Sequence, residues 1–94
     1  FKLEPSSCGL ACVEHVREVI QHESTGELAA IIVEPIQGRL GNIVPPAGFL
    51  SALKSVAREF DALLIVDETM TCLGRTGKML ASEHDDVVPD IVIM

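Results

Sequence analysis

The sequence is short of basic residues and of long apolar runs. Its 94 residues hold seven Lys and Arg against 14 Asp and Glu, a formal net charge of −7 at pH 7. Because this charge would repel a phosphate backbone, we expect no nucleic-acid partner. The apolar runs at 28–33 and 62–66 are far too short to cross a bilayer, so we expect no membrane partner either. With no signal peptide visible, we expect a soluble protein of the cytoplasm or the mitochondrial matrix.

The cysteines lack the spacing of a metal or redox site. Cys8, Cys12 and Cys72 are odd in number and form no CxxC pair. Cys8, Cys12 and His15 could share one face of a helix and hold a metal ion together. Ordinary reduced, partly buried thiols are the simpler interpretation, and we therefore expect no metal site.

The sequence does contain alternating helix and strand patterns. Apolar residues at three- and four-residue steps predict an amphipathic helix at 9–22. Residues 28–33 are apolar without alternation, as in a strand that is covered on both faces. The remaining pattern predicts a loop at 38–46, a helix at 47–60 with Pro46 near its first turn, a buried strand at 62–66, a short helical piece at 79–83 and a strand at 90–94.

This order of elements predicts an α/β fold. A strand, a helix and a second strand of these lengths form a parallel crossover, so we expect a mainly parallel sheet with flanking helices. No internal repeat or linker divides the chain, and residues 1–94 are expected to belong to a single domain with no internal boundary. The chain ends on an apolar run, and we expect it to be an internal piece of a longer protein.

Two acidic residues stand where an open parallel sheet binds its ligands. Glu34 follows the first predicted strand and Asp67 follows the second, so both would lie at the carboxyl ends of the strands. A single acid in this position can simply end the strand with a polar residue. Two adjacent strands that both end in this way, each before a loop with glycine, favour a binding site.

Five short motifs carry a more specific signal. They are Glu34-Pro35-Ile36-Gln37-Gly38, Pro45-Pro46-x-Gly48-Phe49-Leu50, Leu63-Leu64-Ile65-Val66-Asp67-Glu68, Gly74-Arg75-Thr76-Gly77-Lys78 and Pro89-Asp90-Ile91. In order and spacing, residues 28–94 resemble the class III aminotransferases, which are enzymes of fold type I that depend on pyridoxal 5'-phosphate (PLP). The resemblance implies a fragment of the large, PLP-binding domain of a homodimeric enzyme. Such an enzyme moves an amino group between an amine or amino acid and a 2-oxo acid.

The resemblance also implies roles for the residues at the end of the second strand. Asp67 would pair with the protonated pyridine nitrogen of PLP, an interaction worth about 4 kcal/mol at about 4 Å and an effective dielectric constant near 20. Thr69 stands where the family usually has a valine against the cofactor ring. Met70 stands where a glutamine commonly hydrogen-bonds the phenolic oxygen of the cofactor, and methionine cannot donate that bond.

Two further residues are placed at the edge of the active site by the resemblance. Glu34 is one, and Arg39 stands where several members have a glutamate that pairs with a substrate-binding arginine, so the charge is reversed. We expect Arg39 to meet a substrate carboxylate or a neighbouring acid, and an exposed loop arginine is the alternative. The Schiff-base lysine is expected about two residues beyond Met94, so residues 1–94 would hold no catalytic residue and be inactive alone.

Three other interpretations stay open at this level. Residues 63–68 fit the Walker B strand of a P-loop NTPase, although the sequence contains no matching phosphate loop. A PLP-dependent decarboxylase or aminomutase of the same family would use the same aspartate. A non-enzymatic protein that binds a partner through an unpaired strand edge is the third.

Overall fold

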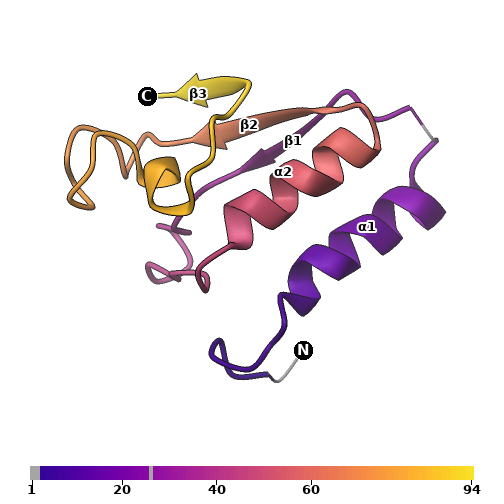
Figure 1. The fold of residues 1–94 in the computed structure, drawn as a ribbon, viewed down its shortest axis with the longest axis horizontal. Coiled ribbons are helices and arrows are strands. Elements are labelled where there is room, and N and C mark those ends of the chain that lie inside the picture. Colours follow the sequence, from indigo (N-terminus) through magenta and orange to yellow (C-terminus); the bar gives the residue numbers. More distant parts are fainter. Residues whose placement is uncertain (1–2, 26) are drawn as a thin grey trace.

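The computed structural model describes residues 3–25 and 27–94 and contains one parallel sheet with helices beside it (Figure 1). The sheet has the order β1-β2-β3, and both pairs of strands are parallel. The predicted α/β class with a parallel sheet is therefore confirmed. In chain order the elements are α1 (Ala11–Glu23), β1 (Ala30–Val33), α2 (Phe49–Glu59), β2 (Leu63–Asp67), the 3₁₀ helix η1 (Ala81–Asp85) and β3 (Ile91–Ile93).

Both α-helices start two residues later than the sequence predicts. Leu10 before α1 and Gly48 before α2 have φ of 57° and 87°, in the left-handed region that an α-helix excludes. Pro46 consequently precedes the cap of α2 and is not in its first turn. Asp67 is the last residue of β2, whereas the sequence predicts it just after the strand. The helical piece expected at 79–83 is η1, which begins and ends two residues later.

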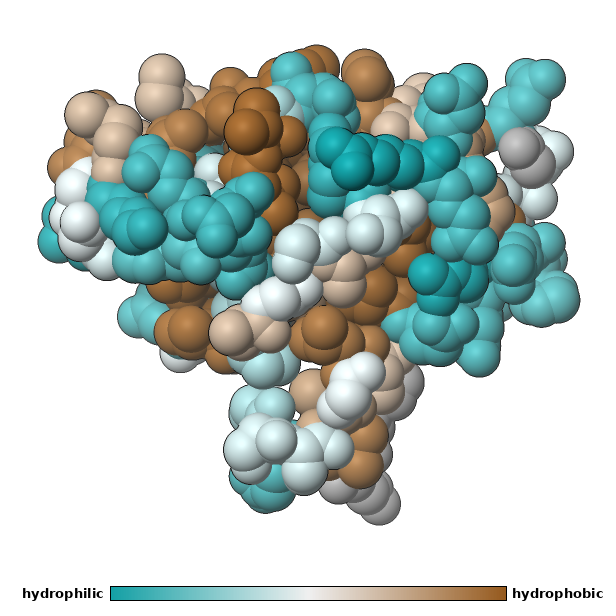
Figure 2. Space-filling model, in the orientation of Figure 1, coloured by the Kyte–Doolittle hydropathy of each residue, from teal (hydrophilic) through white to brown (hydrophobic). Residues whose placement is uncertain are grey.

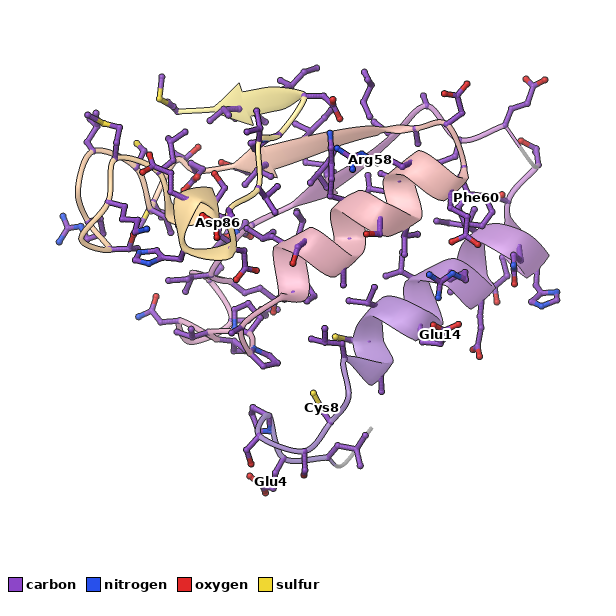
Figure 3. All side chains as sticks on the ribbon, in the orientation of Figure 1. Glu4, Cys8, Glu14, Arg58, Phe60 and Asp86 are labelled. Atoms are coloured by element: carbon purple, nitrogen blue, oxygen red, sulfur yellow. The ribbon has the colours of Figure 1, made fainter. Side chains whose placement is uncertain are left out.

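One face of the sheet packs against the helices. In the parallel register Ile31 lies beside Leu64 and Val33 beside Val66, and these side chains join the core under α2. α1 packs on α2 on the same side of the sheet (Figure 1), and Phe60, just after α2, packs against this core (Figure 3). The buried core is made of Val13, Ile20, Leu50, Leu53, Val56, Ala57, Leu64, Val66 and Val87.

The other face of the sheet is open. Ile32 is 63% exposed, Leu63 47% and Ile91 45%, and in the region of β3 apolar side chains reach the surface of the space-filling view (Figure 2). The expectation that the first strand is covered on both faces is therefore wrong for the chain that the structure describes, because both α-helices lie on the same side.

The parallel strands bring their carboxyl ends to one end of the molecule. The β1–α2 loop and the segment between β2 and η1 both begin there (Figure 1). A short bridge between Gln37 and Ile43 folds the first of these loops back on itself. Among the described helices, none has the length and apolar character needed to span a membrane.

Candidate functional site

Asp67 ends β2 with its carboxylate held in a fixed orientation. Its Oδ1 accepts hydrogen bonds from the Thr69 N–H at 3.0 Å and the Thr69 hydroxyl at 2.5 Å. These bonds, the hydroxyl first, hold the pKa of Asp67 below its ordinary value although some burial opposes them. No described residue donates a hydrogen bond to Oδ2. Asp67 therefore offers an ionised carboxylate with one available oxygen at the carboxyl end of the sheet.

Glu34 is the corresponding acid after β1. Its Oε2 accepts a hydrogen bond from the Gly38 N–H at 3.1 Å, which closes the start of the β1–α2 loop. A Cβ built on Gly38 would lie 3.8 Å from Glu34 Oε2 and also 3.8 Å from Met70 Cγ. Glu34 and Met70, from two different loops, thus share the space around Gly38. The structure brings the two loops together as their positions in the sequence predicted.

The other predicted residues are more open to solvent. Thr69 is exposed, and Met70 is 68% exposed. Arg39 is also exposed and forms no ion pair with any residue in 3–25 or 27–94. A neighbouring acid, one of the two partners expected for Arg39, is therefore not found in this part of the chain.

A cavity of about 320 Å³ is lined by Glu34 but not by Asp67, Thr69, Met70 or Arg39. Glu34 and Gln37 line it from the loop that follows β1, while Cys8 and Cys12 line it from the other side. Figure 3 shows Cys8 in the segment that leads into α1. All three cysteines are free thiols, as expected from their spacing.

Sequence reasoning missed the role of Glu68. Its side chain is fully buried, and its carboxylate accepts hydrogen bonds from the Thr71 hydroxyl at 2.6 Å, the Ala81 N–H at 2.7 Å and the N–H and hydroxyl of Ser82, both at 3.0 Å. In a Walker B strand this glutamate would have to face water and polarise it. With both oxygens occupied by protein donors, Glu68 cannot do so, and the NTPase interpretation loses its support.

The chemistry of these residues fits a cofactor with a cationic ring nitrogen. Such a nitrogen needs an ionised acceptor with an available oxygen, and Asp67 supplies both. The described lysines are not placed to act on it. Lys54 Nζ lies 2.5 Å from Asp90 Oδ2, and Lys78 Nζ lies 3.5 Å from the Glu83 carbonyl oxygen.

Comparison with known proteins gives a consistent assignment. A sequence model of the family described as aminotransferase class-III matches residues 2–94. An ornithine aminotransferase of Toxoplasma gondii, whose structure has PLP at partial occupancy in its active site, is 44% identical over 85% of this chain, with a TM-score of 0.78. An aminotransferase of Bacillus anthracis is 37% identical over 86% of this chain, with a TM-score of 0.81.

A third relative agrees with these two. The ornithine delta-aminotransferase of Plasmodium falciparum is 36% identical over 85% of this chain, with a TM-score of 0.77. The matched region makes up 18% of the Toxoplasma and Bacillus chains and 20% of the Plasmodium chain. The present chain thus spans about a fifth of the length of these relatives.

Proposed function

This chain belongs to the class-III aminotransferase family, and on that premise we propose that the full-length protein is a PLP-dependent aminotransferase. It moves an amino group between an amine or amino acid and a 2-oxo acid, and residues 1–94 form part of its PLP-binding large domain. The observation that carries this proposal is the Asp67 carboxylate, which has one oxygen fixed by Thr69 and the other available at the carboxyl end of β2. Bound PLP supplies an electron-withdrawing ring that stabilises negative charge on the substrate carbon.

Asp67 holds a proton on the cofactor's ring nitrogen. Because its pKa is lowered by the two hydrogen bonds from Thr69, the carboxylate stays ionised at neutral pH and favours the protonated ring. A unit-charge pair at about 4 Å contributes about 4 kcal/mol at an effective dielectric constant near 20, or about three pKa units of the ring nitrogen. Thr69 would therefore serve the cofactor in two ways, by fixing the orientation of Asp67 and by providing a side chain to pack against the ring.

The neighbouring residues serve binding and orientation. We assign Met70 to a contact with the cofactor, in which it packs and donates no hydrogen bond. Glu34 fixes the β1–α2 loop through the Gly38 N–H, and Arg39 on that loop is free to bind a substrate carboxylate. The full-length enzyme is a homodimer in this proposal, and its amino donor is either an amine or an amino acid.

The test is PLP binding by the full-length protein and by two variants. The apoprotein is titrated with PLP and followed by absorbance, and amino transfer from a panel of amines and amino acids to 2-oxo acids is assayed in parallel. Asp67→Ala should weaken PLP binding by on the order of 100-fold or more, because the ring loses its anionic partner. Asp61→Asn, in the exposed turn before β2, is the matched control and should bind PLP as the wild type does.

Each other result has a defined meaning. Wild-type protein that binds no PLP, or Asp67→Ala that binds it normally, would refute the proposal. Release of carbon dioxide, or isomerisation of the amino acid without amino transfer, would replace aminotransferase with decarboxylase or aminomutase and leave the role of Asp67 intact. If Arg39→Ala leaves the KM for carboxylate substrates unchanged, Arg39 does not bind the substrate and is an ordinary exposed loop arginine.

A further inference from the structure

We propose that Glu68 is a positioning residue for Asp67, which fastens the segment carrying Asp67, Thr69 and Met70 to η1 through a buried carboxylate. The inference rests on the proposed function, because it concerns the residue that would hold the cofactor. Asp67 and Glu68 are neighbours in the chain but have opposite environments. Asp67 has an available oxygen at the end of the sheet, whereas Glu68 is fully buried.

Every polar group of Glu68 has a partner. Its N–H donates to the Ile93 carbonyl at 2.8 Å, and its own carbonyl accepts from the N–H groups of Thr71 and Cys72 at 3.0 and 2.9 Å. Carboxylate oxygen Oε1 accepts from Thr71 and Ala81, and Oε2 accepts twice from Ser82. Glu68 thus joins the end of β3, the turn at 68–72 and the start of η1.

This arrangement can only hold while η1 stays in place. No cation pairs with Glu68 among the described residues, so its negative charge is balanced by neutral donors alone. Burial raises the pKa of Glu68, but the hydrogen bonds from Thr71, Ser82 and Ala81 outweigh this effect and leave the pKa below its ordinary value. If η1 moved away, a buried carboxylate would lose three of its donors, which is strongly unfavourable.

The bonds between Glu68 and η1 affect Asp67 through Thr69. The N–H and hydroxyl of Thr69 orient Asp67 Oδ1, and Thr69 lies between Glu68 and Thr71, which are hydrogen-bonded to each other by both main chain and side chain. Figure 3, where Asp86 marks the residue after η1, shows η1 below the end of β2, and the Glu68 carboxylate joins the two. Fixing η1 to Glu68 therefore fixes the donors that orient Asp67.

Glu68→Gln in the full-length protein is the sharpest test. Each carboxylate oxygen of Glu68 accepts one backbone N–H, from Ala81 or Ser82, so the amide NH₂ of glutamine must face a donor in either orientation. Lys54→Met is the matched control, because it breaks a partly buried contact with Asp90 away from the carboxyl end of β2. Two quantities are measured, the Kd for PLP and the amide hydrogen exchange of residues 69–72 and 81–82 in the cofactor-free protein.

We expect Glu68→Gln to raise the Kd for PLP about tenfold or more and to accelerate exchange in both segments. Lys54→Met should leave both quantities within about twofold of the wild type. Should Glu68→Gln fail to fold, Ser82→Ala and Thr71→Val, which each remove side-chain donors only, should raise the Kd about twofold to fivefold. An unchanged Kd in the variants that fold, or an equal rise in Lys54→Met, would overturn the inference.

The exchange measurement separates this inference from the proposed function. If the wild type binds no PLP, the proposed function fails, and exchange in the cofactor-free protein alone decides the role of Glu68. Faster exchange at residues 69–72 in Glu68→Gln but not in Lys54→Met supports a positioning role. Equal exchange in the two variants refutes that role.

Discussion

The Thr69 side chain gives Asp67 two properties that a cofactor partner needs. It donates to one carboxylate oxygen at 2.5 Å, which fixes the rotamer of Asp67, and it helps to lower the pKa of the carboxyl. The second oxygen keeps its capacity to accept. At this position the family usually has valine, whose side chain cannot donate a hydrogen bond. The Thr69 hydroxyl therefore makes a bond to Asp67 that a valine could not make.

Thr69→Val should isolate the effect of that hydroxyl, because the two side chains have nearly the same shape. Loss of the bond lets the pKa of Asp67 rise toward its ordinary value, so the acid limb of the PLP-binding profile should move to higher pH. We also expect about a threefold to tenfold weaker Kd at neutral pH. The measurement is the Kd for PLP from about pH 3, below the ordinary Asp pKa of about 3.9, to about pH 7, with Thr69→Ser as the control that keeps the hydroxyl. Identical profiles for Thr69→Val and Thr69→Ser would show that the hydroxyl has no such role.

The residues of the site differ in how far the sequence predicts them. Asp67 and Glu34 follow apolar runs, and the parallel arrangement of the strands places them at the same end of the sheet. Glu68 carries no comparable signal, because Ala81 and Ser82 lie 13 and 14 residues further along the chain. Such contacts depend on how η1 folds back onto β2, which periodicity does not encode.

At the scale of elements, α2 begins with a cap that comes from elsewhere in the chain. Gly48 precedes the helix and has no side chain to accept from the free N–H groups of the first turn. Asp85, at the end of η1, accepts from the Gly48 N–H at 3.0 Å through Oδ1 and from the Leu50 N–H at 2.9 Å through Oδ2. The same residue therefore caps α2 and ties η1 to it.

Asp85→Ala should lower the free energy of unfolding by about 1–2 kcal/mol, the usual cost of losing a helix cap. Asp85→Asn should cost about as much, because in either orientation its NH₂ group must face the N–H of Gly48 or of Leu50. Urea denaturation of the full-length protein measures both, and Asp86→Asn serves as the neighbouring control, with an expected change below about 0.5 kcal/mol. If Asp86→Asn lowers the free energy of unfolding as much as Asp85→Ala does, the loss in Asp85→Ala comes from disturbing this segment and not from losing the cap of α2.

The helix boundaries show why the sequence placed the elements correctly but not their ends. Apolar spacing identified both helices, yet Ala47 and Gly48 were included in the second because nothing in their spacing excludes them. The left-handed backbone of Gly48 stops the helix there, and Asp85 stabilises that start from 35 to 37 residues away. A cap supplied by such a distant residue leaves no local signature of the kind that Ser, Thr, Asp or Asn gives at the cap position.

At the scale of the whole molecule, the sheet has one packed face and one open face. The apolar runs at 28–33 and 62–66 have no polar alternation, which is typical of strands covered on both sides. Both α-helices lie on the same side, so Ile32 and Leu63 stay exposed. The apolar runs therefore predicted the strands, and the helix between them predicted their parallel direction correctly, whereas residues 3–25 and 27–94 leave the second face of the sheet uncovered.

The folded molecule should lose stability in acid because it keeps several carboxylates ionised. The pKa of Asp67, Glu68 and Asp90 is lowered by hydrogen bonds that exist only in the fold. The unfolded chain therefore binds more protons as the pH approaches the ordinary carboxyl pKa of about 4, and stability must increase with pH in that range. The stabilisation is complete above the unfolded pKa and is lost as the pH falls through the folded one.

Glu68→Gln turns this relation into a prediction for the full-length protein. Glutamine does not titrate, so the variant lacks the pH-dependent contribution of Glu68. The difference in denaturation temperature between wild type and variant should be largest above about pH 6 and shrink as the pH falls below about 4, because a protonated Glu68 also places a donor against the N–H groups of η1. Thermal scans between these pH values measure the difference in denaturation temperature, with Lys54→Met as the comparison. A difference that stays constant would mean that folding does not lower the pKa of Glu68, and one that widens in acid would mean that Glu68 is protonated in the folded protein.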